Sequence, residues 1–574
     1  MKTLQDLVKD YHIKIDEISK SSLNTDQKDL IKKILTSISQ NSKADESLIQ
    51  QVYQLLIQRV KIGFTFDAAP TAKVDTIAYL KKNEELSFTG NENKTQNTLI
   101  IGENYDALKN LLFVEDHTHT HTHTHTHTHT HTERERDNFG YDVIDPPYNT
   151  ERSAFEGNKV ADDKETILAN KFVYRDKFSR NGWLNMLKER LELAKQLLSD
   201  QGVILVSIDD NEQAYLKVLM DDIFGEENFI ANFVFAKVKA PKNNVKLISS
   251  NHEYIICFAK NIKSVNVKLN ERTEKQLAQF KNKDNDPRGP WDRITLTSMK
   301  YKKERDFEIE FEGKIYTPTK GKSWLYTKDR MLELIKDKRI YSEGKMLRQK
   351  FFLSEVKQGV TPISIIYDEI LNDGVDNNWD TDVFTIFKKE YLNTLLINKD
   401  IHGNSQNGTE SLMKVLNGRK FDFPKSLKLL KYLIRIFSLE NSKILDFYAG
   451  SGTTGHAVLE LNKEDGGNRS YTLVTNNENN IAYDITYERL YRINYGKGFK
   501  NKDEFPWIKN NSPFSSNLNV FEIKYKNMAI NSNEKLEDLL SDVNQMLQDF
   551  GILSFNLSTQ QILSKLRSLK QLDS

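Results

Sequence analysis

The chain has 574 residues, of which 38% are hydrophobic and 28% charged, and its formal net charge is +1. No apolar run approaches the ~20 residues that a membrane-spanning helix needs, and the N-terminal sequence lacks the apolar core of a secretory signal, so we expect no membrane insertion and a cytoplasmic location. Cys257 is the only cysteine, which excludes an internal disulfide and a cysteine-based zinc site. With a charge this close to neutral, any surface for nucleic acid must be a local patch.

Residues 1–70 are predicted to form a small N-terminal helical domain. Apolar residues recur at three- and four-residue spacing between Leu4 and Ile18, and again between Ile49 and Val60. This is the period of an amphipathic helix. A linker that contains Pro70 follows.

Residues 71–261 are predicted to be the first part of an α/β domain, because strand and helix patterns alternate along them. The order is a strand that turns at Gly102 into a helix near Tyr105, a strand over 141–144, a helix over 183–198, a strand over 203–208, a helix over 212–224, and β-rich runs over 229–236 and 253–259. The last two runs can close the sheet as an antiparallel pair. Residues 117–132 are a perfect His-Thr alternation, from which no packed core can be built, and we predict a solvated insertion there.

The second half of the chain changes character twice. Residues 262–405 are polar, without regular alternation of strand and helix, and we predict a separate α+β domain. Residues 406–510 resume the α/β pattern, with a helix over 425–436, a strand over 443–448, a helix from Thr454 and a strand over 470–475. This implies one sheet interrupted by an insertion. Residues 511–574 are predicted to be a small α+β tail, suited to assembly with a partner.

Several basic residues are candidate phosphate contacts, although none is assigned singly. They are Lys237, Lys239, Lys242 and the clusters 300–305 and 345–350.

The first motif with chemical meaning is Gly450-Ser451-Gly452-Thr453-Thr454-Gly455, which follows the strand pattern KILDFY and precedes a helix pattern. Glycines in this context let the backbone turn sharply and approach a nucleotide-like ligand. An acidic residue after the next strand, here Glu478, can hold ribose hydroxyls. A phosphate-binding P-loop fits less well, because His456 replaces its lysine. A plain strand-to-helix turn stays open.

The second motif is Asp145-Pro146-Pro147-Tyr148, at the carboxyl end of a predicted strand, where ligands of open α/β sheets bind. Prolines fix the backbone and donate no hydrogen bond, so nearby carbonyls can accept from an external amino group. The Asp145 carboxylate can accept a second bond from that group, and Tyr148 can stack on a ring. A proline turn that only caps the strand is the alternative.

Together the two motifs resemble those of the beta-order amino-DNA methyltransferases, in which a target-recognition domain lies between them. More narrowly, DPPYNTE at 145–151 and VTNNEN at 474–479 look like the modification subunit of type III restriction-modification systems. The resemblance covers most of the chain and is strongest over 100–260 and 423–493. It implies an α/β fold: a Rossmann-like methyltransferase sheet, an inserted α+β target-recognition domain and small terminal domains.

The resemblance implies methyl transfer from S-adenosylmethionine to the N6 nitrogen of adenine in double-stranded DNA, with the target base flipped out of the duplex. Asp145, Pro146, Pro147 and Tyr148 would be catalytic, and no metal would take part. The implied cofactor-binding residues are Asp446, Phe447, Gly450, Gly452, Thr454, Glu478, Pro424, Lys425, Gly102 and Glu103. The segments Phe423-Pro424-Lys425 and Gly102-Glu103-Asn104, which resemble family segments beside the cofactor, can equally be structural. The implied partners are a restriction subunit and a second copy of the chain.

Three alternatives stay open at this point. Cytosine-N4 methylation is the nearest, and Asp145 favours adenine because cytosine enzymes of this type commonly have Ser there. A nicotinamide-dependent dehydrogenase would use the same glycine loop but leaves the DPPY motif without a role. A catalytically impaired DNA-binding protein of the same fold is the third.

The His-Thr tract bears on both expression and activity. His and Thr can be written CAC and ACA, so the tract can be a dinucleotide repeat that slips in replication, and we hypothesise phase-variable expression, as in some members of the resembling family. Metal binding by the histidines is not predicted, since nothing fixes their geometry. The tract either bulges out and leaves the sheet intact, or it shifts the register of the strand over 141–144 and damages the site.

Overall fold

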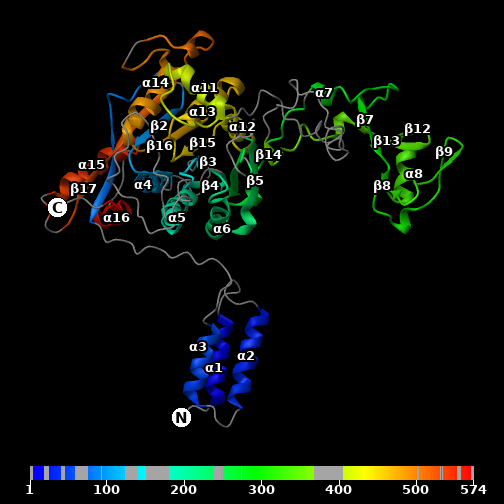
Figure 1. Ribbon diagram of the computed structural model, residues 1–574, viewed down its shortest axis with the longest axis horizontal. Helices are drawn as coiled ribbons and strands as arrows, with labels where there is room; N and C mark the ends of the chain where they lie inside the picture. Colours follow the sequence, from blue (N-terminus) through cyan, green and yellow to red (C-terminus); the bar gives the residue numbers. More distant parts are fainter. Residues whose placement is uncertain are drawn as a thin grey trace. The chain divides into compact units, whose positions relative to one another are not determined.

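The structure is a computed structural model, drawn in Figure 1. It describes residues 4–17, 25–40, 45–57, 75–91, 94–122, 139–149, 180–236, 247–248, 250–272, 274–366, 405–500, 503–529, 532, 534–552 and 558–570. The chain divides into two compact units, Met1–Asp67 and Ala68–Ser574. Within the described ranges, no helix has the length and apolar character needed to cross a membrane.

The first unit contains three helices, α1 (Leu4–Glu17), α2 (Thr25–Ser39) and α3 (Glu46–Ile57). Their apolar faces meet in a small core, and the ring of Tyr11 stacks on that of Tyr53 with centroids 4.1 Å apart. The helices predicted from the three- and four-residue spacing are therefore confirmed. The predicted linker at Pro70 lies outside the described residues.

The second unit is built on a ten-stranded sheet. In spatial order its strands are β1 (Thr76–Lys82), β17 (Asn517–Asn527), β2 (Gln96–Ile101), β16 (Ser470–Thr475), β15 (Lys443–Asp446), β3 (Phe139–Ile144), β4 (Leu198–Ile208), β6 (His252–Ala259), β5 (Phe229–Ala236) and β14 (Ile365–Ile366). The strands from β17 to β4 run parallel, whereas β1 and β6 are antiparallel to their neighbours. Strands β15 and β16, from after the polar insertion, lie between β2 and β3, from before it. One interrupted sheet and the antiparallel β5–β6 pair are thus confirmed.

Helices cover this sheet on both sides (Figure 1). They are α4 (Asn104–Thr122), α5 (Arg180–Leu197), α6 (Gln213–Phe224), α11 (Ser405–Leu416), α12 (Leu427–Phe437), α13 (Thr453–Asp465), α14 (Glu488–Tyr495), α15 (Leu536–Asp549) and α16 (Thr559–Lys565). Helix α4 packs on α5 and α5 on α6, while α12 packs on α13 and α13 on α14. Because both faces are covered, consecutive residues of β3 from Tyr141 to Ile144 are all buried.

The carboxyl ends of four adjacent strands bring the predicted site residues to one edge of the sheet. Strand β3 leads into Asp145, β15 into Phe447, β16 into the segment with Glu478, and β2 into Gly102. From β3 the chain continues to β4 on one side, and from β15 it continues to β16 on the other. The two strands therefore flank a topological switch point, where open α/β sheets bind ligands.

Two edge features differ from the sequence analysis. Strand β1 was not predicted, and β17 belongs to the main sheet rather than to a small C-terminal tail. Strand β17 pairs with β1 from Thr76–Asn527 to Lys82–Phe521, and it pairs parallel with β2 on its other side. Pairing between segments more than 400 residues apart leaves no trace in local sequence patterns, which is why it was missed. An assembly role for residues 511–574 stays a prediction.

The His-Thr tract begins inside helix α4, which ends at Thr122. The first part of the tract is therefore helical rather than an irregular insertion, because extending an existing helix is far easier than nucleating one. Residues 123–132 lie outside the described residues. Strand β3 is nevertheless paired with β15 on one side and β4 on the other, so the sheet is intact beyond the tract.

Of the polar segment 262–405, the structure describes residues 262–272, 274–366 and 405. It contains α7 (Glu274–Leu277), β7 (Trp291–Thr295), β8 (Thr297–Ser298), β9 (Ile309–Phe311), β10 (Lys314–Tyr316), β11 (Ser323–Trp324), α8 (Lys328–Lys336), β12 (Ile340–Glu343) and β13 (Met346–Phe352). Strands β12, β13 and β7 form a three-stranded sheet. A separate apolar cluster around Trp324, Met331 and Leu334 forms a core of its own.

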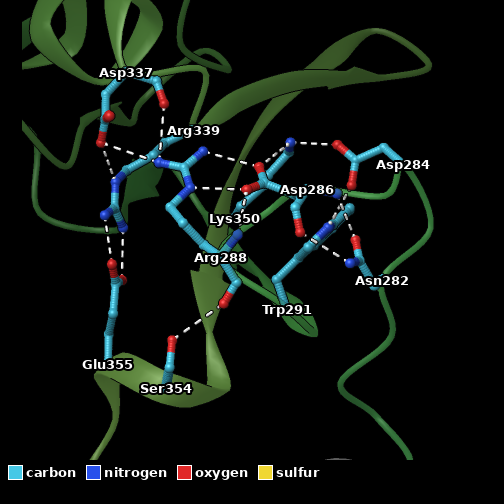
Figure 2. A network of polar contacts seen from close by, with 10 residues as sticks. All are labelled: Asn282, Asp284, Asp286, Arg288, Trp291, Asp337, Arg339, Lys350, Ser354 and Glu355. Atoms are coloured by element: carbon cyan, nitrogen blue, oxygen red, sulfur yellow. Dashed lines mark hydrogen bonds and ion pairs between the residues drawn. The ribbon is translucent and has the colours of Figure 1, made fainter.

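A connected set of ionic side chains, which we call the Asp286 network, holds this segment together (Figure 2). Asp286 accepts hydrogen bonds of 2.9 Å from Nε and Nη2 of Arg288 and pairs with Lys350 Nζ at 3.0 Å. Arg339 donates two bonds, of 2.6 and 2.5 Å, to Glu355. Lys350 was a candidate phosphate contact, but it is buried and paired with carboxylates. Lys237, Lys239 and Lys242 lie outside the described residues.

Candidate active site

The DPPY segment, Asp145 to Tyr148, leaves β3 as a loop that is anchored at two points. The indole Nε1 of Trp183, on α5, donates a hydrogen bond of 2.7 Å to the Pro147 carbonyl oxygen. Asn149 has a left-handed backbone, with φ of 59°, and its amide donates to Glu212 Oε1 at 2.9 Å. Asparagine tolerates this conformation better than most residues. The loop that carries the motif is thus held from both α5 and the start of α6.

Four side chains around this loop form what we call the Lys425 cluster. The ammonium Nζ of Lys425 lies 2.7 Å from Glu253 Oε1 and 3.2 Å from Asp145 Oδ1, and it donates a hydrogen bond to the Tyr148 hydroxyl. It also lies 5.0 Å from the centroid of the Tyr148 ring. Tyr148 donates a longer bond, of 3.4 Å, to Glu253 Oε2. The segment at 423–425 and the DPPY motif, 277 positions apart, therefore meet.

The electrostatics of this cluster are unbalanced, because one ammonium serves two carboxylates. Burial raises the pKa of the Asp145 carboxyl, Lys425 opposes this rise, and the charge of Glu253 adds to it. Burial acts to lower the pKa of Lys425, but Asp145 and Glu253 outweigh it and raise that pKa. The lysine therefore stays charged, whereas Asp145 is poised to take a proton or a donated hydrogen bond.

Lys425 stands just before a helix instead of inside it. The sequence pattern predicted a helix from Lys425, but α12 begins at Leu427, because the Ser426 hydroxyl accepts a hydrogen bond from the backbone N–H of Leu429 and caps it. Phe423, two residues earlier, has a φ of 57° and is 79% exposed. Pro424 joins the two residues, and its fixed φ helps to direct the chain into the cap.

The glycine loop after β15 has the backbone geometry that its sequence predicted. Gly450 and Gly452 have φ values of 49° and 71°, in the left-handed region where a side chain is strained. A Cβ on Gly452 would lie 3.2 Å from the methyl group of Thr486. The Thr486 hydroxyl donates a bond of 2.5 Å to the Gly450 carbonyl, and the buried Arg489 donates to the Ser451 carbonyl at 3.2 Å. The loop is therefore held from α14 and the turn before it.

Asp446, the last residue of β15, is buried beneath this loop. Its carboxylate accepts bonds from the backbone N–H of Tyr448, at 3.0 Å, and from the Thr454 hydroxyl, at 2.6 Å. Burial raises its pKa to about 7; the Thr454 and Tyr448 bonds oppose this, and the charge of Asp145 adds to it. A carboxyl with this pKa can change its charge on meeting a cationic ligand near neutral pH.

The turn after β2 packs against the same loop. A Cβ on Gly102 would meet Ile523 at 2.7 Å, so only glycine fits there. Glu103 forms an ion pair of 2.6 Å with Arg190, and the Asn104 amide donates to the Phe447 carbonyl at 3.1 Å. Gly102 therefore has a structural explanation, while Glu103 and Asn104 connect this turn to α5 and to the glycine loop.

Glu478 stands apart from these contacts. It follows β16 in a short 3-10 turn over Glu478–Asn480, and its side chain is exposed. Its neighbour Asn477 has a buried Oδ1 that accepts no hydrogen bond within the described part of the chain. The structure therefore brings Asp145, Tyr148 and Lys425 into direct contact and leaves Glu478 at the rim.

Three residues of this region were not found from the sequence as site residues: Trp183, Arg190 and Glu253. Trp183 and Arg190 act through tertiary contacts that no local motif indicates. Glu253 had a detectable signal, because it is a carboxylate at the start of the otherwise apolar strand β6, and it is only 5% exposed. A charged residue in such a strand is seldom buried unless it is paired.

A cavity of about 520 Å³ lies elsewhere, against α11, α12, α13 and the segment around Trp507. Four of its charged side chains are paired with each other: Lys431 with Glu460 at 2.9 Å, and Arg435 with Glu464 at 2.8 Å. We assign it no ligand. Among the described residues, no group of His, Cys, Asp or Glu is arranged to hold a metal ion.

The strand-end region fits a nucleoside ligand that carries a positive charge. The left-handed glycines keep the loop free of side chains, Asp446 offers a buried carboxylate, and the unsatisfied Asn477 oxygen can accept from a hydroxyl. The aromatic Tyr148 and the carboxylate of Asp145 stand after the neighbouring strand. A planar group with an amino substituent can bind there next to the nucleoside.

Comparison with known proteins gives two family matches. Residues 142–495 match a family described as DNA methylase, and residues 8–121 match a family described only as an uncharacterised conserved protein. The first match spans both motifs.

Similar individual proteins include the type III restriction-modification enzyme StyLTI Mod subunit of Salmonella typhimurium, 30% identical over 61% of this chain and 51% of that protein. The type II methyltransferase M.KpnI of Klebsiella pneumoniae is 29% identical over 64% of this chain and 83% of its own. The chain thus spans about half the length of the Salmonella protein. A solved putative DNA modification methylase from Thermus thermophilus is 11% identical over 66% of this chain and 88% of its own, with a TM-score of 0.26.

Proposed function

The chain belongs to the DNA methylase family, and we propose that it is a site-specific DNA methyltransferase that moves a methyl group from S-adenosylmethionine to the N6 amino nitrogen of adenine. The observation that carries this proposal is the placement of Asp145 and Tyr148 at the end of β3, directly beside the glycine loop that follows β15. A base amino group and a methyl donor would meet at this point.

In this proposal the protein works by positioning and by charge. Asp145 accepts a hydrogen bond from the adenine amino group, which increases the electron density on nitrogen, and the ring of Tyr148 stacks on the base. Pro146 and Pro147 fix the loop, and Trp183 holds it in place. Because the amino group is paired in duplex DNA, the base must be flipped out to reach this loop.

The cofactor site comprises the glycine loop and its neighbours. Gly450 and Gly452 allow close approach, Asp446 faces the ammonium group of the ligand, and Glu478 and Asn477 lie where ribose hydroxyls can be held. Phe447 and Thr454 complete the loop, the first buried and the second bonded to Asp446. Bound S-adenosylmethionine supplies a methyl group on a positively charged sulfur, which is already a good leaving group, so no metal is required.

Adenine is favoured over cytosine because a carboxylate, not a hydroxyl, stands at the first position of the motif. Two further sequence-based alternatives fare differently. A nicotinamide-dependent dehydrogenase leaves the Lys425 cluster without a role. A catalytically impaired DNA-binding protein finds little support in β3, which pairs with β4 in continuous register from Tyr141 to Ile144 and pairs with β15 on its other side.

The partners follow from the relatives. The Salmonella relative is the Mod subunit of a type III enzyme, and we propose that this chain likewise modifies double-stranded DNA for such a system, alongside a restriction subunit and as a homodimer. The segment 262–405 would recognise the DNA sequence. A substrate in the chromosome implies a cytoplasmic location. Phase-variable expression through the His-Thr repeat stays a prediction.

The test is transfer of labelled methyl from S-adenosylmethionine to unmethylated genomic DNA, with the modified base mapped by sequencing. We expect labelled adenine at one short site, and a loss of roughly 10²- to 10³-fold in Asp145→Ala. The exposed Asp538→Ala is the matched control and should keep full activity. Labelled cytosine would select the N4 alternative, and DNA binding without transfer would select the impaired one. Absence of cofactor binding would refute the proposal.

A further inference from the structure

Glu253 is the one member of the Lys425 cluster that the sequence analysis did not name as a site residue. It is the second residue of β6, a strand antiparallel to β4, and it reaches the cluster from a part of the sheet that carries no other site residue. Its side chain is 7% exposed, and both of its oxygens are engaged, Oε1 by Lys425 and Oε2 by Tyr148. Burial of a carboxylate costs free energy unless its charge is paired, as it is here with Lys425.

The distances show which of the two carboxylates holds the Lys425 ammonium more closely. Lys425 lies closer to Glu253, at 2.7 Å, than to Asp145, at 3.2 Å. Asp145 Oδ1 is buried, and its contact with the ammonium is the longer of the two. Glu253 therefore takes the larger share of the positive charge, and the Asp145 oxygen is left able to accept a bond from an incoming donor.

We propose that Glu253 is a positioning residue for methyl transfer: by holding the Lys425 ammonium and the Tyr148 hydroxyl, it keeps Asp145 available to the amino group of the target base. This inference rests on the proposed function. Without the Glu253 charge, Lys425 pairs fully with Asp145 and competes with the base for its oxygen. Tyr148 also loses one of the two partners of its hydroxyl.

The role of Glu253 predicts the direction of a pH effect. Transfer needs ionised Asp145, so the rate falls as pH drops and that carboxyl takes a proton. The negative charge of Glu253 raises the pKa of Asp145, so its removal moves the fall in rate to lower pH. The other charged groups that face the cluster are Asp446 and Asp209, and both are unchanged in the comparison.

The experiment compares Glu253→Gln, Glu253→Asp and the unaltered chain, in the full-length protein, by rates of methyl transfer from pH 5 to 9. S-adenosylmethionine is saturating at each pH, so that weaker binding through Asp446 does not set the fall in rate. For Glu253→Gln we expect kcat to fall about tenfold and KM for S-adenosylmethionine to stay within about twofold. The fall in rate on the acidic side of the pH profile, which we call the acidic limb, should move to lower pH by at least about half a pH unit. Glu253→Asp restores the charge and should return the limb toward its original position.

The matched control is Asp210→Asn, at the same edge of the sheet. Asp210 accepts bonds from Tyr254, at 2.9 Å, and from Ser250, at 3.1 Å, and so ties down the start of β6 without contacting the cluster. It should leave the limb in place. Two outcomes would overturn this inference and leave the proposed function standing, provided that the unaltered chain transfers methyl. In the first, the acidic fall in rate stays at the same pH in Glu253→Gln. In the second, it moves by the same amount in Asp210→Asn. Lack of transfer by the unaltered chain would refute the proposed function and this inference with it.

Discussion

The Lys425 cluster and the Asp286 network are both built from carboxylates, lysine or arginine and an aromatic ring, yet their carboxyl groups shift in opposite directions. In the Asp286 network, the hydrogen bonds from Arg288 hold the pKa of Asp286 well below its usual range, and those from Arg339 lower that of Glu355. In the Lys425 cluster, burial raises the pKa of Asp145 despite a lysine within 3.2 Å.

The difference lies in burial and in how each carboxylate is bonded. Both oxygens of Asp286 accept from Arg288 in a planar, two-bond arrangement, and Lys350 adds a third contact. Asp145 is deeply buried, and it shares the ammonium of Lys425 with Glu253. A fully bonded carboxylate stabilises the folded chain, whereas an under-bonded one costs free energy until a ligand donates to it. We infer that the first group serves the fold and the second serves a ligand.

The largest expected effect on folding comes from Asp286→Ala. It removes the shared partner of Lys350 and Arg288, which keep Asp284 and Asp337 respectively, and the loss should be on the order of 2 kcal/mol. Because the pKa of Asp286 is depressed in the folded chain, its contribution is present above the unfolded pKa of ~3.9 and is lost as pH falls through the lower folded pKa. Denaturant unfolding at pH 7, followed by tryptophan fluorescence, measures it.

The control for this change is Glu308→Ala, an exposed carboxylate of the same segment, which should shift stability by less than about 0.5 kcal/mol. Asp145→Ala is the converse variant, since it should remove transfer and leave unfolding of the segment unchanged. If Asp286→Ala unfolded no more easily than Glu308→Ala, the network would not be the element that holds this segment together.

A smaller effect is expected on the affinity for S-adenosylmethionine, which should depend on pH near neutrality, unlike the ionisation of the Asp286 network. Ionised Asp446 is the form that attracts an ammonium group, and its pKa is raised to about 7. Affinity for S-adenosylmethionine should therefore weaken roughly tenfold between pH 7.5 and pH 6, while the carboxylates of the Asp286 network, whose pKa values are lowered, stay ionised. Titration calorimetry at both pH values measures the change.

In Asp446→Asn the group that titrates is gone, so binding should be weak at both pH values and nearly independent of pH. An unaltered chain that binds S-adenosylmethionine equally well at pH 7.5 and pH 6 would show that Asp446 does not hold the ammonium group.

Much of the central fold was predictable because its signals are local. The strand pattern KILDFY followed by glycines and a helix gave β15, the loop and α13, and the apolar run over 203–208 gave the core of β4. Strands β1 and β17 were missed because each is specified by its partner far along the chain. The sequence pattern placed the start of α12 two residues too early, because Lys425 has ordinary helix propensity. In the structure Ser426 caps the helix, so that α12 begins after Lys425.

The site was predictable to the extent that it consists of contiguous motifs. The sequence placed Asp145 and Tyr148 after one strand and the glycines after another, and both placements hold in the structure. It assigned Lys425 to the cofactor, whereas in the structure Lys425 contacts the DPPY motif. Glu253 was missed because its role depends on two partners, one in the loop after β3 and one just before α12, and no spacing rule connects it to either.

The smallest expected effect comes from shortening the His-Thr tract by one pair. Helix α4 is anchored before the tract by buried residues as far as Val114, and β3 is fixed by pairing on both sides. Loss of two residues between these anchors should leave transfer within about twofold of the unaltered chain. Deletion of Asp142 and Val143, the same number of residues taken from β3 itself, should abolish transfer, because it pulls the DPPY loop back along the sheet. A tenfold loss from the shortened tract would mean that the tract sets the position of Asp145, and its length would then tune activity as well as reading frame.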